Sequence, residues 1–342
     1  METTIRRGDD FHTHLREGEM LEKVLPFSNI WGRVTVMGNL SKPVATAHDV
    51  IKYRNKILQL NPKFIPIMSV MLVNSATPEI LRKTFEAGAK VLKLIPGGAS
   101  TNSSEGVGLE NLHIYYPVLE EAQKLGMIFS GHWELATNPL GGEEISEVER
   151  EERAMPYLEK IIASFPNLKI IVEHATTKGM IEFVKNAPAN VASTLTVHHA
   201  LLTYNRVYHC DGINPFNYCK PVAKFVYDRK AIVEAMISGN PKFFFGSDSA
   251  PHLPERKRGQ NPAAGIFTPA EVALTMLTEI FDSFGALSEL ENFISMSGAE
   301  FYDLPLNKDF ITLRRKKWTV PKDYNGIVPF MAGHELKWKI VK

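Results

Sequence analysis

The chain has 342 residues, of which 44% are hydrophobic and 23% charged, and its 39 basic and 38 acidic residues give a net charge of +1. This near balance argues against nucleic acid or an anionic membrane as the partner. The sequence contains no run of about 18 apolar residues, so it predicts no membrane-spanning helix. The polar start lacks the apolar segment of a secretory signal, so we expect a cytoplasmic protein with reduced thiols.

Short apolar runs alternate with amphipathic stretches along the chain, a pattern typical of βα units around a parallel sheet. Eight runs predict strands, at Ile5–Phe11, Val34–Met37, Phe64–Val70, Val91–Leu94, Met127–Ser130, Lys169–Glu173, Asn190–Ser193 and Phe243–Gly246. They favour an α/β fold, a (β/α)8 TIM barrel with its active site at the carboxyl ends of the strands. The alternative is an open doubly wound sheet, which normally carries a glycine-rich phosphate loop after its first strand. No such loop follows Phe11.

The barrel is expected to form one domain over residues 1–342, with a C-terminal extension from about residue 305 that closes its outer or bottom surface. Two intervening helices have recognisable signals. One is predicted to begin after Thr77 and to close at Gly88. Ser146 and Glu149 predict a capping box for another, which Pro156 should kink or split in two.

The first candidate site lies at the end of the first predicted strand, where two histidines are separated by one residue. Side chains alternate between the two faces of a strand, so His12 and His14 project the same way. Two imidazoles on one face form a pair of candidate metal ligands. Alone the pattern is weak, because two unrelated polar residues on a surface strand produce it as well.

Other predicted strands also contain or end in single residues that can bind a metal or transfer a proton. His132, His174 and Asp248 follow the apolar runs of the fifth, sixth and eighth strands, and a barrel would bring them to one mouth. Lys93 lies in the apolar fourth strand, where burial favours its neutral amine. A neutral amine can add carbon dioxide, and the carbamate can bridge two metal ions. The alternative is a lysine that reaches past the strand end to solvent.

These residues, in this order, resemble the amidohydrolase superfamily with a binuclear metal centre, and more closely the shorter bacterial type of dihydroorotase. The matching segments are residues 11–21, 36–40, 93–96, 100–104, 173–178 and 246–252. The resemblance implies reversible hydrolysis of L-dihydroorotate to N-carbamoyl-L-aspartate in de novo pyrimidine biosynthesis, and it implies a homodimer. The only other partner expected is this small-molecule substrate.

The resemblance also implies two Zn²⁺ ions per subunit. The ligands would be His12, His14 and Asp248 on the more buried ion, His132 and His174 on the more exposed one, and carboxylated Lys93 as the bridge. The ions would lower the pKa of a bound water toward about 7. Asp248 would accept the proton of this water and pass it to the leaving amide nitrogen.

Further positions correspond to substrate contacts in that family. Arg16 would hold the substrate carboxylate through a bidentate contact, together with Asn39 and His252. A related cyclic amidase, such as a dihydropyrimidinase or an allantoinase, is the enzymatic alternative. A ring without a carboxylate would leave the buried arginine unpaired, which is unfavourable.

The ring itself would contact the backbone of Ala264 and of Lys220, which replaces an apolar residue of the family, so a side-chain contact there is in doubt. Residues 97–108 correspond to a mobile loop, in which Ser100 and Thr101 would close over the substrate. Ser100 stands where threonine is usual.

A non-catalytic scaffold is an alternative of a different class, since some relatives of the superfamily have become structural proteins. Such relatives lose metal ligands, whereas all six candidates stand in this sequence. His198 and His199 follow the seventh predicted strand, where adjacent residues point to opposite faces, so at most one would face the mouth. Cys219 is interpreted as a small buried hydrophobic residue.

Overall fold

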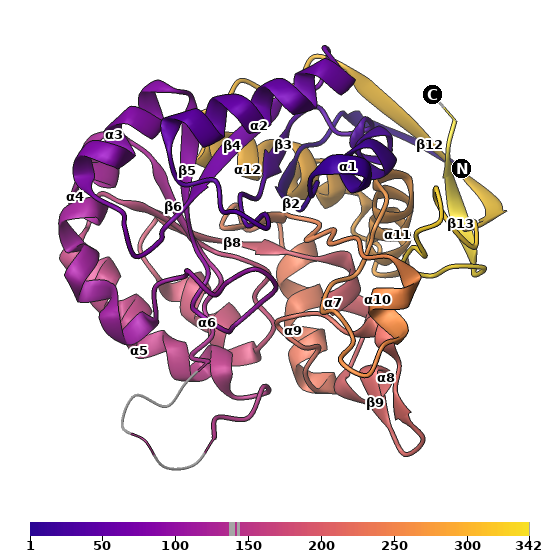
Figure 1. Ribbon diagram of the computed structural model, residues 1–342. Helices are drawn as coiled ribbons and strands as arrows, with labels where there is room; N and C mark the ends of the chain where they lie inside the picture. Colours follow the sequence, from indigo (N-terminus) through magenta and orange to yellow (C-terminus); the bar gives the residue numbers. More distant parts are fainter. Residues whose placement is uncertain (137–140, 142–143, 342) are drawn as a thin grey trace.

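The computed structural model describes residues 1–136, 141 and 144–341, and its centre is a parallel barrel (Figure 1). Each strand pairs in parallel with the next one in the barrel, in the order β11-β8-β7-β6-β5-β4-β3-β2. The strands are β2 (Asp10–Thr13), β3 (Val34–Val36), β4 (Pro66–Met71), β5 (Ala89–Leu94), β6 (Ile128–Gly131), β7 (Lys169–Val172), β8 (Val191–Leu195) and β11 (Phe243–Phe245). The predicted α/β barrel is confirmed.

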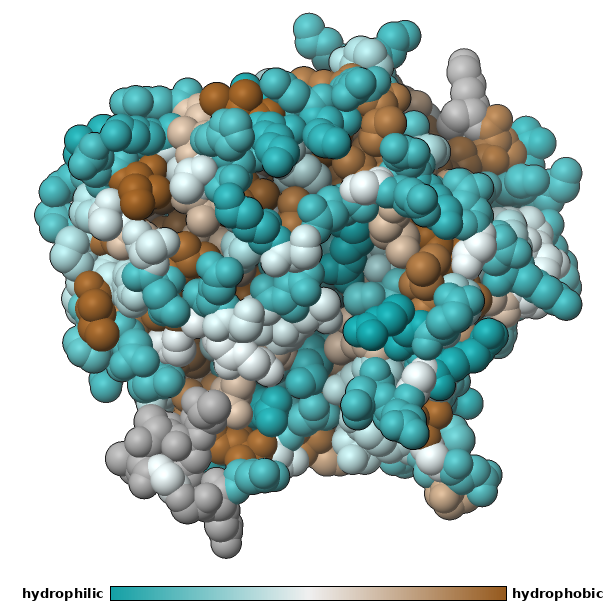
Figure 2. Space-filling model, viewed as in Figure 1, coloured by the Kyte–Doolittle hydropathy of each residue, from teal (hydrophilic) through white to brown (hydrophobic). Residues whose placement is uncertain are grey.

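Helices surround this barrel, as the ring of coiled ribbons in Figure 1 shows. They are α1 (Gly18–Val24), α2 (Ala47–Leu60), α3 (Pro78–Glu86), α4 (Tyr116–Lys124), α5 (Arg150–Ser164), α6 (Lys178–Asn186), α7 (Val197–Leu201), α8 (Tyr204–Val207), α9 (Val226–Ile237), α10 (Pro254–Arg258), α11 (Ala270–Ser283) and α12 (Ser297–Phe301). None of the helices in these described ranges is long and apolar enough to cross a membrane. On the face shown in Figure 2, hydrophobic residues occur as separate spots among hydrophilic ones.

The predictions for the two intervening helices were partly right. Thr77 caps α3, where its hydroxyl accepts the amide of Ile80, as predicted. The predicted capping box at Ser146 was wrong, because α5 begins only at Arg150 and the Glu149 amide donates to the Ser146 backbone carbonyl instead. Pro156 does not split α5. A proline removes a single helical hydrogen bond, and the buried apolar face of α5 supports the helix on both sides of it.

One apolar side chain from most barrel strands points into the barrel and forms a layer across it. This layer consists of Phe11, Ile67, Val91, Ile128, Ile171, Ala192 and Phe244. Since side chains repeat every two residues along a strand, the next layer toward the carboxyl ends includes Lys93, Ser130, Glu173 and Thr194. All four are buried and polar. An apolar layer thus closes the barrel beneath a polar one.

The first predicted strand was wrong in its extent, because it is two strands. The first of them, β1 (Glu2–Arg6), lies outside the barrel and pairs antiparallel with β12 (Phe310–Thr319). Residues 7–9 separate β1 from the barrel strand β2. The break contains Asp9, whose buried carboxylate binds the Arg33 guanidinium and cannot face an apolar core. β12 pairs in turn with β13 (Glu335–Ile340), so the predicted C-terminal extension forms a sheet with the N-terminus. Figure 1 shows the two chain ends close together.

The barrel closes between its first and last strands without a regular ladder. The Asp248 amide donates to the His12 carbonyl at 2.8 Å, and the His14 amide donates to the Ser249 carbonyl at 3.0 Å. The buried Asp10 carboxylate accepts the Ser247 amide at 2.8 Å. This seam brings the residues after β11 against the end of β2.

Candidate functional site

Three of the predicted metal ligands meet at the seam between β2 and β11. His12 Nε2 lies 3.4 Å from His14 Nε2, and Asp248 Oδ1 lies 3.3 Å from the first and 3.0 Å from the second. A tetrahedral zinc ion with bonds of about 2.0–2.1 Å holds its ligand atoms about 3.3 Å apart. The triangle of these three atoms therefore has the dimensions of one face of a tetrahedral coordination shell.

A second pair of histidines faces this triangle from β6 and β7. His132 Nδ1 lies 3.3 Å from His174 Nε2, again the spacing of two ligands of one ion. The rings of His12 and His174 have centroids 5.1 Å apart, so the two groups adjoin. One ligand atom each from His12, His174 and Asp248 fits within 4.8 Å. The site thus offers donors for two neighbouring ions.

Two buried glutamates orient the histidines, and the sequence reasoning gave neither a role. Glu173 Oε2 lies 2.7 Å from His12 Nδ1, and Glu134 Oε2 lies 2.8 Å from His132 Nε2. Each carboxylate holds one ring nitrogen, so that the other faces the ligand group. Their positions in the sequence could have identified them, since Glu173 directly precedes His174 and Glu134 follows His132 by two residues.

Lys93 is a buried lysine in the polar layer of the barrel. Its side chain is completely buried, and Nζ has no hydrogen-bond partner among the described residues; its nearest charge is Glu173 Oε1 at 3.9 Å. Burial lowers the pKa of Lys93 to about 8. A buried amine without hydrogen bonds is destabilising, so these surroundings are unusual for an unmodified lysine.

The electrostatics of His14, His174 and Asp248 suit metal binding. His12 differs, because the Glu173 carboxylate outweighs the effect of burial and raises the pKa of His12 to about 9, so this ring must lose a proton before it can bind a metal ion. Burial lowers the pKa of His14 to about 4 and that of His174 well below its usual value, so both rings are neutral near pH 7. Burial opposes ionisation of Asp248, but hydrogen bonds from His12 and His14 bring its pKa well below the usual value. Neutral imidazoles and an ionised carboxylate are the forms that coordinate a divalent cation.

The backbone is strained at three of these positions. His174 and Asp248 both have φ of 44°, and Arg16 has φ of 61°, in the left-handed region that non-glycine residues rarely adopt. Each comes just after a barrel strand. Such strain persists where the surrounding structure enforces it, and it concentrates at functional sites.

The residues predicted to bind the substrate carboxylate are Arg16, Asn39 and His252, and Arg16 and His252 lie side by side. Arg16 Nη2 and His252 Nε2 are 3.0 Å apart, and the Arg16 Nε donates to the Pro251 carbonyl at 3.2 Å. Burial lowers the pKa of Arg16 to about 10, so it remains a cation near neutral pH. Asn39 is buried, and its Oδ1 has no hydrogen-bond partner in the described ranges.

The predicted loop lies over this group. The Thr101 hydroxyl reaches the Ala264 carbonyl at 3.4 Å, and Asn39 Nδ2 donates to the Thr101 carbonyl at 3.1 Å. Ser100 is bound within the loop, where its amide and carbonyl both contact the Ser103 hydroxyl. The Lys220 ammonium lies 3.4 Å from Glu147 Oε1, an ion pair that the sequence did not indicate.

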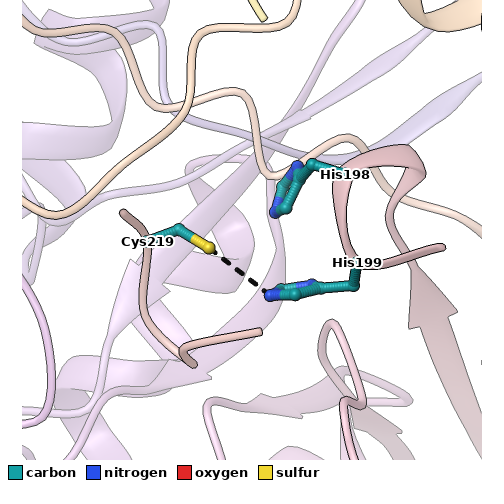
Figure 3. A group of neighbouring side chains, drawn as sticks. All are labelled: His198, His199 and Cys219. Carbon is teal, nitrogen blue, oxygen red and sulfur yellow. Dashed lines mark hydrogen bonds between the residues drawn. The ribbon is translucent and has the colours of Figure 1, made fainter. Parts of the chain in front are cut away.

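A separate cluster, His198, His199 and Cys219, is shown in Figure 3. The two histidines lie on α7 and not on a strand, so the expectation that they face opposite ways was wrong: both are buried, with ring centroids 4.4 Å apart. Both nitrogens of His199 have partners, Thr196 Oγ1 at 2.8 Å and the Pro221 carbonyl at 2.9 Å. Burial raises the pKa of the Cys219 thiol. The thiol is therefore protonated, and neither ring nitrogen of His198 has a hydrogen-bond partner among the described residues.

No protein-family model matches the chain. Among curated proteins, it is 40% identical over 349 residues to a dihydroorotase of Teredinibacter turnerae, with 99% of this chain and 98% of the relative covered. It is also 41% identical over 347 residues to a dihydroorotase of Shewanella sp. (strain ANA-3), with 98% of each covered.

Solved structures give the same result. Saccharomyces cerevisiae dihydroorotase in complex with 5-fluoroorotic acid superposes with a TM-score of 0.93 at 33% identity, covering 99% of this chain and 98% of that one. Dihydroorotase from Campylobacter jejuni has a TM-score of 0.88 at 33% identity, covering 100% and 98%. An Arthrobacter aurescens L-hydantoinase shares the fold, with a TM-score of 0.81, but only 16% of its residues are identical. By sequence and by structure, the chain belongs to the dihydroorotase family, hydrolases of cyclic amide bonds.

Proposed function

We propose that this chain interconverts L-dihydroorotate and N-carbamoyl-L-aspartate at a centre of two Zn²⁺ ions bridged by carboxylated Lys93. The observation that carries the proposal is a partly buried guanidinium, Arg16, beside two sets of histidines spaced as metal ligands. His12, His14 and Asp248 would hold one ion, and His132 and His174 the other. The bound ions would polarise the scissile carbonyl and lower the pKa of the attacking water.

The protein side chains then position the substrate and move its protons. Arg16, with Asn39 and His252 beside it, would bind the ring carboxylate through charge-assisted hydrogen bonds. Asp248, ionised and facing the ligand group, would accept the proton of the attacking water and deliver it to the departing ring nitrogen. The backbone at Ala264 and Lys220 would hold the ring between these groups.

The loop completes the site. Thr101 contacts Ala264 and Asn39, so residues 97–108 would cover a bound ring and exclude bulk water. Ser100 would contribute a second hydroxyl. The Lys220 side chain pairs with Glu147, which supports a role for its backbone and not for its ammonium in ring binding.

Further properties belong to the same proposal. Residues 1–342 would form one domain, supported by the pairing of β1 with β12 of the C-terminal extension. The resemblance supports a homodimer. A cytoplasmic location is consistent with two cysteines that are not disulfide-bonded.

The decisive test is substrate preference. Purified protein loaded with zinc should turn over dihydroorotate far faster than dihydrouracil, hydantoin or allantoin, because only the first carries a carboxylate for Arg16. Preference for a ring without a carboxylate would favour a dihydropyrimidinase-like function. Absence of any turnover, with no zinc bound, would favour a non-catalytic scaffold.

Replacement of Arg16 by lysine or glutamine should weaken dihydroorotate binding and leave zinc content unchanged. Lysine cannot reproduce the planar two-point contact with a carboxylate, and glutamine removes the charge. We expect KM to rise by at least about tenfold for lysine, the loss of one charged hydrogen bond, and further for glutamine. Steady-state kinetics and metal analysis check this. Unchanged KM in both variants would eliminate the carboxylate clamp.

The equilibrium of the catalysed reaction should depend on pH in one direction. Ring opening creates a carboxyl group with a pKa near about 3.9, that of an aspartate side chain, so hydrolysis releases a proton at neutral pH. Raising the pH should therefore increase the ratio of carbamoyl-aspartate to dihydroorotate, and lowering it should favour the ring. Chromatography of equilibrated mixtures would measure the ratio. A ratio independent of pH would show that another reaction is catalysed.

A further inference from the structure

Lys257 is a buried lysine that the proposed mechanism leaves without a role. It lies on the short helix α10, five residues after His252, and only 3% of it is exposed. Its ammonium donates to three backbone carbonyls, those of Tyr218 at 3.0 Å, Ala263 at 2.8 Å and Gly265 at 2.6 Å. An ammonium has three N–H donors, so all of them are used by backbone groups.

These carbonyls belong to the two segments that would contact the substrate ring. Ala263 and Gly265 flank Ala264, and Tyr218 lies two residues before Lys220. The segments also meet directly, since the Gly265 amide donates to the Tyr218 carbonyl at 3.0 Å. One ammonium therefore joins both segments and fixes their separation.

The direction of the carbonyls shows what this fixation achieves. The carbonyls of Ala263 and Gly265 face Lys257, whereas the carbonyl between them, that of Ala264, faces the site, where it meets His252 Nε2 at 3.0 Å and the Thr101 hydroxyl at 3.4 Å. Holding the two outer carbonyls sets the orientation of the central residue. Gly265 suits this arrangement because it has φ of 144° and a Cβ there would lie 2.7 Å from the Ala250 carbonyl.

We propose that Lys257 is a positioning residue that holds the backbone of Ala264 and of residues 218–220 in the geometry that binds the substrate ring. The proposal rests on the proposed function. It extends that function, because Lys257 would affect the affinity for the substrate ring through the ring-binding backbone and without contacting the ring itself. Burial lowers the pKa of Lys257 to about 8, so near pH 7 the ammonium is still charged and donates all three bonds.

The chain offers a matched control at the other end of the barrel. Lys242 also donates to three backbone carbonyls, those of Val184 at 3.2 Å, Lys185 at 3.3 Å and Ala187. It directly precedes β11, at the amino end of the strand, whereas the site lies at the carboxyl ends. Loss of Lys242 thus removes comparable bonds without touching the ring-binding segments.

The experiment compares Lys257→Met, Lys257→Arg and Lys242→Met in the zinc-loaded, full-length protein. For Lys257→Met we expect KM for dihydroorotate to rise by about tenfold or more, with a smaller change in kcat and unchanged zinc content. Lys257→Arg keeps the charge but cannot direct three protons at three carbonyls, so its KM should rise less. Lys242→Met should lower the Tm and leave KM unchanged.

Each outcome decides a separate point. Unchanged KM in folded Lys257→Met would overturn the positioning role, as would an equal rise of KM in Lys242→Met, which would indicate general destabilisation. If Lys257→Met does not fold, KM of Lys257→Arg decides, and a wild-type value there overturns the proposal. Failure of the proposed function would appear differently, as wild-type protein that does not turn over dihydroorotate at all.

Discussion

Replacement of Lys93 by alanine should remove most of the bound zinc and nearly all activity, and added acetate or propionate should restore part of both. The wild-type carbamate would supply two oxygens between the ions, and the alanine variant leaves a gap of that size in the polar layer of the barrel. A short carboxylate carries the same two oxygens and can occupy the gap. Zinc content and turnover, measured against carboxylate concentration, test this expectation.

Lys224→Ala is the control for this rescue. Lys224 is also buried, and its ammonium donates to the carbonyls of Glu147 and Val222. Its ammonium also lies 3.9 Å from Glu134 Oε1, so its removal should lower both stability and activity, but acetate cannot replace a hydrogen-bond donor and no rescue is expected. Wild-type protein with two zinc ions and a mass that lacks one CO₂ on Lys93 would contradict the bridge. The ligand triangle around His12 would be unaffected by that result.

Replacement of Asp248 by alanine should leave substrate affinity nearly intact and reduce kcat by several orders of magnitude. Loss of a positioned acid–base group alone costs roughly 10²–10⁴-fold in rate. Asp248 is also part of the ligand triangle, so its loss should disturb metal binding in addition. Calorimetric binding of dihydroorotate beside steady-state kinetics separates the two effects.

A buried aspartate elsewhere provides the comparison. Asp228 accepts the backbone amides of Phe225 and Lys178 at the start of α9, outside the site. Asp228→Ala should lower the Tm, since it removes a helix cap, while kcat stays close to the wild-type value. An Asp248→Ala variant that keeps more than about a tenth of wild-type kcat would show that another group transfers the proton.

The barrel was predictable because its strands are buried on both faces and appear as short, continuous apolar runs, so their order could be read directly. That these polar side chains meet at one end of the barrel was predictable because His132, His174 and Asp248 interrupt such runs at their ends; their role as metal ligands stays a prediction. The split of β1 from β2 was not, since the segment looks like one run and the break depends on a partner, Arg33, distant in sequence. Pairing of β1 with residues beyond 305 likewise depends on contacts that no local pattern encodes.

The residues that orient the site were harder to predict than those that form it. Glu134 and Glu173 act through close contacts between their carboxylates and histidine rings, and such partners are defined by geometry and not by spacing. Lys257 lies in a basic stretch of α10 that looks like a solvated helix face. Only the fold shows that its neighbours Arg256 and Arg258 are exposed while Lys257 itself is buried.

The seam of the barrel has a consequence for the order of events during synthesis. His12 and His14 emerge early, but the groups that close the barrel against them, around Ser247, follow 234 residues later. Closing so long a loop is entropically costly, and contacts of this separation form late in folding. A nascent chain therefore carries these histidines without their partner carboxylate until the 234 residues from His14 to Asp248 have been translated. The ion would acquire its complete shell only when the last barrel strand docks, so barrel closure and site assembly are one step.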